Sequence, residues 1–253
     1  MSRDFTQILA ELQAGFIDEL PERCTAVEAQ ILALERGEDA AFNELYRLVH
    51  SLKGAGGTFG LAIITTICHQ FETFLSLVHA DFKQAESAIA LRYVDLVRSA
   101  VQPAGREPAG VAAIEHSLEK LRSKNMGGRF AVLVVDGSAA MRRLYQEVFA
   151  SRPSVHVQMA DTGLSALERL LHEPFDLLVA SREMADLNAI ALTAAVRESG
   201  RCNKDIPVIV ITSNPKPVPA HLKIRARIRR DPKFAQQLLG HVNELKAEIG
   251  RPD

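Results

Sequence analysis

The chain of 253 residues is poor in cysteine and has no long apolar run, and each absence excludes a class of protein. Its three cysteines, Cys24, Cys68 and Cys202, form neither a pair motif nor a metal-binding spacing, which indicates free thiols in a reducing compartment. No apolar stretch reaches the length of a membrane span. The first residues, MSRDFTQILAELQ, are amphipathic and include acids, unlike a secretory signal. We therefore expect a cytoplasmic protein with no membrane partner.

Nucleotide-binding and metal-binding motifs are also missing. The sequence has no Walker-type loop, no glycine-rich ATP lid and no cluster of metal ligands. The segment Asp161–Gly163 is too short to be a nucleotide-binding motif. We therefore expect no kinase catalytic domain, and neither a metal nor a cofactor bound by this chain.

The net charge of −1 conceals an asymmetry between the two halves of the chain. Residues 1–128 carry 12 basic and 17 acidic side chains, a net charge of −5, whereas the remainder carries 18 basic and 14 acidic, a net charge of +4. The halves therefore either attract one another or suit different partners.

Residues 1–105 contain no convincing strand pattern, and their hydrophobic periodicity is helical. Short breaks at Pro21, Gly37–Asp39, Gly60 and Ala80–Asp81 separate the helical stretches. The expected helices are Asp4–Leu20, Cys24–Arg36, Ala40–Phe59, Leu61–Ala80 and Phe82–Val101. Helices with such short connections pack as antiparallel neighbours, so we predict an all-α antiparallel helical bundle over residues 1–105.

The stretch PAGREPAG, Pro103–Gly110, has the composition of a linker. A short amphipathic helix, Val111–Lys124, is expected to follow it. This helix could dock on the bundle, pair with its copy in a dimer, or act as a spacer. We assign residues 106–128 to a linker that contains this helix.

Residues 129–253 show a different pattern, in which apolar runs alternate with helical stretches. The run FAVLVV, Phe130–Val135, is continuously apolar, as in a strand that is buried on both faces. Further strands are expected at Val155–Met159, Leu177–Ala180, Ile206–Ile211 and Ile224–Ile228, and helices at Ala139–Phe149, Leu164–Leu171, Ala189–Glu198 and Lys233–Ile249. The alternation predicts a doubly wound α/β domain with a five-stranded parallel sheet.

The stretch HSLKGAGGTFG, His50–Gly60, is the most informative in the bundle. It continues a helical pattern although glycine destabilises a helix by about 1 kcal/mol relative to alanine. On a 3.6-residue period, four of its residues share one face: His50, Lys53, Gly54 and Gly57. That face offers an imidazole, a cation and bare backbone, which suits the approach of an anionic group such as a phosphoryl.

The sequence His50-Ser-Leu-Lys53-Gly54, followed by Gly57 and Gly60, resembles the phosphoacceptor motif of histidine phosphotransfer (HPt) domains. It is similar to the phosphotransfer domain of chemotaxis histidine kinases over about the first hundred residues. The resemblance implies that His50 accepts the phosphoryl group and that His69 and Glu72 support it.

Simple geometry agrees with this set of residues. If a turn at Gly60 joins two antiparallel helices, residues at equal distances from the turn face each other. His50 lies ten residues before Gly60, and His69 and Glu72 lie nine and twelve residues after it. A carboxylate at one imidazole nitrogen would fix the tautomer and raise the nucleophilicity of the other nitrogen. The alternatives are a surface histidine, a solvated Glu72 and a His69 that serves only in packing.

The second half resembles a response-regulator receiver domain through VLVVDG, ADTGLSAL, FDLLVAS and IPVIVITS. The resemblance implies a pocket of acids, an acceptor aspartate, a hydroxyl and a lysine. Here the corresponding residues are Asp136, Gly137, Ser181, Thr212 and Asp231. Only Asp136 and Thr212 keep the type of group that the family uses.

These departures predict a pseudo-receiver. A serine hydroxyl cannot form an acyl phosphate, and a single acid supplies too few oxygen ligands for a divalent cation. Glu183 and Asp186 are the alternative acceptors, but both fall in the loop after the strand. We therefore expect that residues 129–253 neither accept nor transfer a phosphoryl group.

Two further stretches of this half depart from the family pattern. SNPKPVPAHLK, Ser213–Lys223, has three prolines where a receiver has its fourth helix, so that helix should be short or missing. KIRARIRR, Lys223–Arg230, is strongly basic. It is either a charged strand edge or a docking surface for an acidic partner. No recognition-helix pattern accompanies the charge, so we expect no nucleic-acid partner.

Together these observations predict a phosphorelay protein of a two-component system. His50 would receive a phosphoryl group from a histidine kinase or a phosphorylated receiver and pass it to a response-regulator aspartate. The chain would be a phosphotransfer intermediate, and Mg²⁺ would belong to the partner. The pseudo-receiver would serve protein–protein contact or a homodimer. The alternatives are a kinase-binding regulator without phosphotransfer and a structural scaffold.

Overall fold

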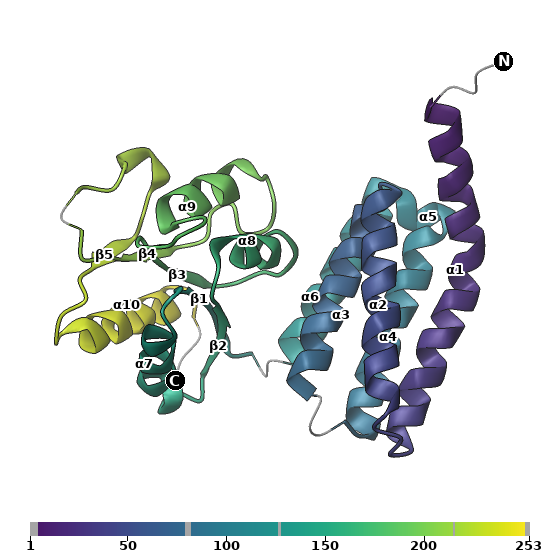
Figure 1. Cartoon of the computed structure of the whole chain (residues 1–253), viewed down its shortest axis with the longest axis horizontal. Coiled ribbons are helices and arrows are strands. Elements are labelled where there is room, and N and C mark those ends of the chain that lie inside the picture. Colours follow the sequence, from purple (N-terminus) through teal and green to yellow (C-terminus); the bar gives the residue numbers. More distant parts are fainter. Residues whose placement is uncertain (1–4, 79–81, 126–127, 215, 251–253) are drawn as a thin grey trace. The chain divides into compact units, whose positions relative to one another are not determined.

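The computed structural model describes residues 5–78, 82–125, 128–214 and 216–250 (Figure 1). The chain divides into two compact units, Met1–Arg122 and Ser123–Asp253. Among the described residues, no helix combines the length and the apolar character that are needed to cross a membrane.

The first unit is all-α, as the periodicity predicts. Its helices are α1 (Phe5–Glu35), α2 (Ala41–Thr58), α3 (Ala62–Val78), α4 (Gln84–Val101), α5 (Pro103–Arg106) and α6 (Pro108–Asn125). The longest helices run side by side in Figure 1 and enclose one apolar core. Leu20, Ile31, Leu45, Ile64 and Leu75 are fully buried in that core.

Pro21 does not break the first helix, contrary to our expectation of two helices. α1 continues through it from Phe5 to Glu35. A proline inside a helix costs about 3 kcal/mol because one backbone hydrogen bond is lost. Here Leu20 and Cys24, on either side of the proline, are both fully buried. Continuous core contact on both sides of Pro21 therefore outweighs the local preference for a break.

The expected linker Pro103–Gly110 is also helical for the most part, which corrects our interpretation. Pro103 and Pro108 are the first residues of α5 and α6, where the missing N–H of proline costs no hydrogen bond. A Cβ at Gly105 would lie 1.9 Å from the carbonyl oxygen of Ser99, so only glycine allows α5 to pack this closely on α4. The prolines of the expected linker thus begin helices, and its Gly105 allows close packing.

Helix α6 docks on the bundle, which decides among the three roles left open for it. Ile114 and Leu118 are buried in the bundle core. Much of the segment 106–128, which we assigned to a linker, therefore packs within the first unit.

A tight turn reverses the chain between α2 and α3. The N–H of Leu61 donates to the carbonyl oxygen of Gly56 at 2.8 Å, and Gly60 adopts the left-handed conformation with φ of +72°. This arrangement is the glycine-based helix cap that closes many α-helices. The cap sends α3 back antiparallel along α2, as the sequence geometry requires.

Gly56 is the glycine that sets the distance between these two helices. A Cβ at this position would lie 3.0 Å from the backbone nitrogen of Thr65 and 3.1 Å from Cβ of Ile64. Gly54 differs, because a Cβ there would meet nothing within 4 Å. The glycines of this helix therefore have separate roles, one in helix packing and one on an open surface.

The second unit is a five-stranded parallel sheet with the strand order β2-β1-β3-β4-β5, which confirms the predicted doubly wound α/β fold. The strands are β1 (Phe130–Val135), β2 (Val155–Ala160), β3 (Leu177–Ser181), β4 (Val208–Ile211) and β5 (Ala226–Ile228). The helices are α7 (Ala139–Ala150), α8 (Gly163–His172), α9 (Ala189–Glu198) and α10 (Phe234–Glu248), with a 3₁₀ turn at Ala220–Leu222. In register, Phe130 of β1 pairs with Val155 of β2, and Val132 pairs with Leu177 of β3.

The alternation of side chains along β1 divides the core into two layers. Ala131, Leu133 and Val135 pack on the side of α8 and α9. Phe130, Val132 and Val134 pack on the side of α7 and α10, which Figure 1 shows below the sheet. Because both faces are covered, every residue of β1 is buried, as its continuous apolar run predicts.

Strand boundaries and the fourth connection differ slightly from a regular β/α repeat. β4 begins at Val208 rather than Ile206, and β5 begins at Ala226 rather than Ile224. Pro207 precedes β4 and has no N–H to donate to a neighbouring strand. The proline-rich stretch 213–223 holds a single 3₁₀ turn among its described residues, in line with the expected loss of a helix.

Two substitutions test the separate roles of Gly56 and Gly54 in α2. Gly56→Leu should lower the free energy of unfolding of the bundle by about 1–3 kcal/mol, because the side chain overpacks the contact with α3. Gly54→Ala should raise it by up to about 1 kcal/mol, because the helix gains propensity at an open position. Urea titrations followed by circular dichroism measure both. Equal effects of the two substitutions would contradict the assignment.

Candidate functional site

Three polar side chains of the bundle meet across α2 and α3. Nδ1 of His50 lies 2.9 Å from Oε1 of Glu72, and Nζ of Lys53 lies 2.7 Å from Oε2 of the same carboxylate. The Glu72 side chain is 8% exposed, whereas that of His50 is 66% exposed. A nearly buried carboxylate therefore holds a solvent-exposed imidazole on one side and an ammonium on the other.

The local fold explains this meeting. His50 and Lys53 lie three residues apart on α2, so both project from one face of the helix. The turn at Gly60 brings α3 back beside that face, and the close contact at Gly56 keeps the helices near each other. Glu72 thereby reaches both side chains, as the count of residues from the turn predicts.

The contact determines which nitrogen of His50 can react. A neutral imidazole with its proton on Nδ1 donates that proton to the Glu72 carboxylate. Nε2, on the far side of the ring, then carries the lone pair. Since most of the His50 side chain is exposed, the arrangement presents a nucleophilic nitrogen to a bound partner.

Lys53 lies on the predicted face of α2, beside His50. That its ammonium attends incoming phosphoryl oxygens stays a prediction. In the structure its side chain is 17% exposed and its Nζ contacts Glu72. The ammonium therefore compensates the charge of a nearly buried carboxylate, which would be costly to bury alone.

The remaining predicted residues of this site lie on the same two helices. His69 is buried on α3, one turn before Glu72, and its part in the hydrogen-bond network stays a prediction. Gly54 and Gly57 are exposed on α2, so bare backbone adjoins the exposed His50. Thr65 was missed by the sequence analysis, and its Oγ1 donates to the carbonyl oxygen of Lys53 at 3.3 Å.

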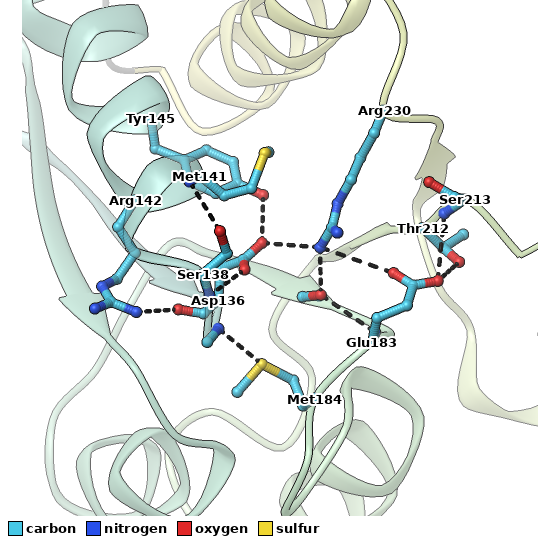
Figure 2. A network of polar contacts seen from close by, with 12 residues as sticks. Asp136, Ser138, Met141, Arg142, Tyr145, Glu183, Met184, Thr212, Ser213 and Arg230 are labelled. Atoms are coloured by element: carbon cyan, nitrogen blue, oxygen red, sulfur yellow. Dashed lines mark hydrogen bonds and ion pairs between the residues drawn. The ribbon is translucent and has the colours of Figure 1, made fainter.

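A second polar cluster lies at the carboxyl ends of the parallel strands, where Figure 2 shows it at close range. Asp136 follows β1, Ser181 ends β3 and Thr212 follows β4. All three are buried, with exposures of 1%, 0% and 0%. The tertiary structure therefore brings these predicted pocket residues to one edge of the sheet.

Arg230 connects the members of this cluster. Its Nη2 donates to Oδ2 of Asp136 at 3.1 Å and to Oγ of Ser181 at 2.7 Å. The same nitrogen lies 3.8 Å from Oε2 of Glu183. The Arg230 side chain is 26% exposed, so the guanidinium reaches into the pocket from its rim.

Asp136 is held from several directions. Its Oδ1 accepts from the N–H of Ser138 at 2.9 Å, and its Oδ2 lies 3.5 Å from the hydroxyl of Tyr145. Burial, followed by the nearby charge of Asp136, raises the pKa of Tyr145. Tyr145 therefore stays protonated and can donate to the carboxylate.

Gly137 and Asp186, which the sequence also suggested for this site, each make a contact outside the Arg230 network. The N–H of Gly137 contacts Sδ of Met184 at 3.2 Å, so a methionine covers the position where an acid was expected. Asp186 accepts from the N–H of Leu164 at 3.0 Å, at the start of α8. This hydrogen bond holds the pKa of Asp186 below its usual range. Asp186 therefore acts as a helix cap.

The structure corrects our placement of Asp231 in the pocket. Asp231 is exposed, and its Oδ1 accepts from the N–H of Lys233 at 2.9 Å, just before α10. Ile228 is buried and Arg229 is exposed, whereas Arg230 lies in the bend after β5 with its guanidinium at Asp136.

Comparisons with known proteins identify a domain family for each unit. The Hpt domain family matches residues 11–124, and the response regulator receiver domain family matches residues 132–227. The chain belongs to the receiver domain family and carries an Hpt domain fused ahead of the receiver domain. The resemblances from which we started are thus confirmed.

Individual relatives match one domain each. The chemotaxis protein CheA of Rhizobium meliloti is 30% identical over 106 residues, which are 40% of this chain but 14% of that protein. The chemotaxis protein CheY of Pseudomonas aeruginosa is 33% identical over 85 residues, 34% of this chain and 68% of that protein. The solved structure of CheY4 from Vibrio cholerae is 20% identical, with a TM-score of 0.42, and covers 46% of this chain and 98% of its own.

The pocket of the receiver domain does not fit a divalent cation. Such an ion needs several oxygen ligands in close range. Asp136 is the carboxylate at the base of the pocket, and Arg230 already contacts it. No group of three or more potential ligand residues is found in the described part of the chain. A cation would have to displace a guanidinium that neutralises Asp136.

The basic stretch Lys223–Arg230 is largely engaged within the receiver domain. Arg225 forms an ion pair with Glu248 at 2.7 Å, and Arg227 donates to the carbonyl oxygen of Lys216 at 3.1 Å. With Arg230 in the pocket, three of the four arginines of this stretch have partners in the same domain. These contacts favour the charged strand edge over a dedicated docking surface.

The role of Lys53 can be tested through stability. Lys53→Met leaves the nearly buried Glu72 without its cation and should lower the free energy of unfolding by about 1–3 kcal/mol. The control is Arg47→Met, which removes an exposed ion pair with Glu44 on the same helix and should leave the unfolding midpoint almost unchanged. Urea titrations measure both. A Lys53 variant as stable as the control would contradict the proposed charge compensation.

Proposed function

We propose that this chain is a phosphorelay protein in which His50 of the Hpt domain carries the phosphoryl group. A histidine kinase or a phosphorylated receiver domain would donate the group, and an aspartate of a response regulator would accept it. The observation that carries the proposal is the contact between Nδ1 of His50 and the nearly buried Glu72, which leaves Nε2 free on an exposed ring.

The chemistry of the proposed step is a transfer between nitrogen and oxygen. Nε2 of His50 attacks the phosphorus of the donor, the Nε2–P bond forms, and the bond to the donor atom breaks with its electron pair. Glu72 holds the Nδ1 proton and stabilises the positive charge that develops on the ring. The reverse sequence delivers the group to a carboxylate of the partner.

The bare surface beside His50 suits this role. Gly54 and Gly57 are exposed on the same helix, and a Cβ at Gly54 would meet no neighbour within 4 Å. A partner can therefore bring its own active site, with its Mg²⁺, close to the imidazole. The match to a CheA-type protein supports a kinase or receiver as the partner, although the chain spans only 14% of that relative.

We also propose that the receiver domain is a pseudo-receiver. The position at the end of β3 is Ser181, whose buried hydroxyl already contacts Arg230 at 2.7 Å. A serine there cannot form an acyl phosphate, and the pocket lacks the ligands for a divalent cation. The domain would then act in contacts between proteins, including dimerisation, rather than in phosphotransfer.

A labelling experiment tests the function of His50. The full chain is incubated with a CheA-type kinase and radiolabelled ATP, or with a labelled phospho-receiver, and acid-labile label is measured. His50→Gln should abolish the label, because the nucleophilic nitrogen is lost. His116→Gln, which changes an exposed histidine on α6, is the matched control and should keep it. If neither donor labels the unchanged chain, the result would favour the alternative of a regulator that binds a kinase without phosphotransfer.

Replacement of the residue at the acceptor position tests the pseudo-receiver. Ser181→Ala should leave the rate and extent of labelling unchanged, because the hydroxyl takes no part in transfer. In the same samples, mass spectrometry of the phosphorylated peptides should place the label in the Hpt domain alone. Label at Ser181, Glu183 or Asp186 would refute the pseudo-receiver.

A further inference from the structure

The pocket of the receiver domain holds two carboxylates and one guanidinium. Asp136 is fully buried and lies against Nη2 of Arg230. Glu183 lies on the other side of that nitrogen, with its side chain 38% exposed at the rim (Figure 2). One carboxylate is therefore buried against Arg230, and the other lies beside it at the surface.

The carboxylate of Glu183 has the contacts of a bound anion. Its Oε1 accepts from the hydroxyl of Thr212 at 2.5 Å and from the N–H of Ser213 at 3.3 Å. Its Oε2 lies 3.8 Å from Arg230. A hydroxyl, a backbone N–H and a guanidinium are the donors that proteins use to bind oxyanions.

The fixed and the movable parts of this arrangement can be distinguished. Thr212 is fully buried, and its Oγ1 also accepts a hydrogen bond from the N–H of Asn214 at 2.9 Å. Arg230 is anchored by Asp136 and Ser181. Glu183 is more exposed than Arg230 and Thr212, so it can leave while these two donors stay in place.

Arg230 also has donor capacity beyond its present contacts. All three contacts described above involve Nη2. Its Nε is buried and has no hydrogen-bond partner within the described part of the chain. The guanidinium therefore keeps a donor that has no hydrogen bond among the described residues, beside its contact with Asp136.

We propose that Glu183 is a built-in ligand of an oxyanion site formed by Arg230, Thr212 and the N–H of Ser213. Its carboxylate occupies the site in the unmodified protein and excludes free phosphate. This inference rests on the proposed pseudo-receiver, because it explains how the pocket stays closed without a phosphoryl group. The ligand class is a tetrahedral or planar oxyanion, with inorganic phosphate as the probe.

The occupied site has a structural consequence for the segment after β4. Glu183 binds Thr212 and Ser213, while the neighbouring Arg182 donates to the carbonyl oxygen of Lys216 at 2.6 Å. Two consecutive residues after β3 thus attach this segment to the sheet.

Phosphate titration of the full chain, followed by ¹H–¹⁵N NMR, tests the site. In Glu183→Ala the amide signals of Ser213 and Asn214 should shift saturably with inorganic phosphate. The half-saturating concentration should fall at least roughly tenfold below that of the unchanged chain, because the competing internal ligand is gone. Glu183→Gln, which keeps the shape and removes the charge, should show the same direction and serves if the alanine variant folds poorly.

Two controls identify the donors. Glu183→Ala combined with Arg230→Gln should lose the response. Glu244→Ala, which removes an exposed carboxylate beside Arg225 outside the pocket, should behave like the unchanged chain. Equal half-saturation with and without Glu183, or a response that survives the loss of Arg230, would overturn the proposal. Inorganic phosphate transfers no phosphoryl group, so the phosphate titration tests the oxyanion site separately. The pseudo-receiver itself is tested by labelling at Ser181, Glu183 or Asp186.

Discussion

The nearly buried carboxylate of Glu72 is the interaction on which the candidate site of the Hpt domain depends. It divides its two oxygens between His50 and Lys53, so that one residue of α3 fixes two residues of α2. A carboxylate at that depth requires compensation, which Lys53 supplies. The close contact at Gly56 makes this possible, since a larger residue would move the helices apart. The close packing of α2 on α3 and the polar contacts of Glu72 therefore both depend on Gly56.

Each domain contains a buried carboxylate with a cation beside it, but the domains differ in the group that stays exposed. In the bundle, the compensated carboxylate leaves a reactive group facing the solvent. In the receiver domain, Asp136 contacts Arg230, and Glu183 contacts Arg230 and Thr212. The charges of these three residues are therefore engaged within the domain. The internal contacts of Asp136 and Glu183 are the basis on which we propose a pseudo-receiver. This difference supports a division of labour in which the first domain transfers the group and the second contacts other proteins.

Much of the fold could be predicted because periodicity reports burial. The continuous apolar run of β1 and the amphipathic pattern of α2 both follow from the faces that they bury. The failures concern proline and glycine. Pro21 lies inside a helix whose core face continues past it, and Gly105 lies where a helix needs close approach rather than flexibility. Local composition signals a break in both places, whereas contacts with distant residues decide the outcome.

The sequence alone determined that His50, Lys53 and the exposed glycines share a helix face, because helical spacing is a local property. With one turn at Gly60 it also determined that Glu72 could reach that face. Only the tertiary structure decided that Lys53 serves the carboxylate, that Arg230 and not Asp231 enters the receiver pocket, and that Glu183 closes it. These pairings join residues from different strands and helices. Their geometry depends on strand ends that meet only after the sheet has formed.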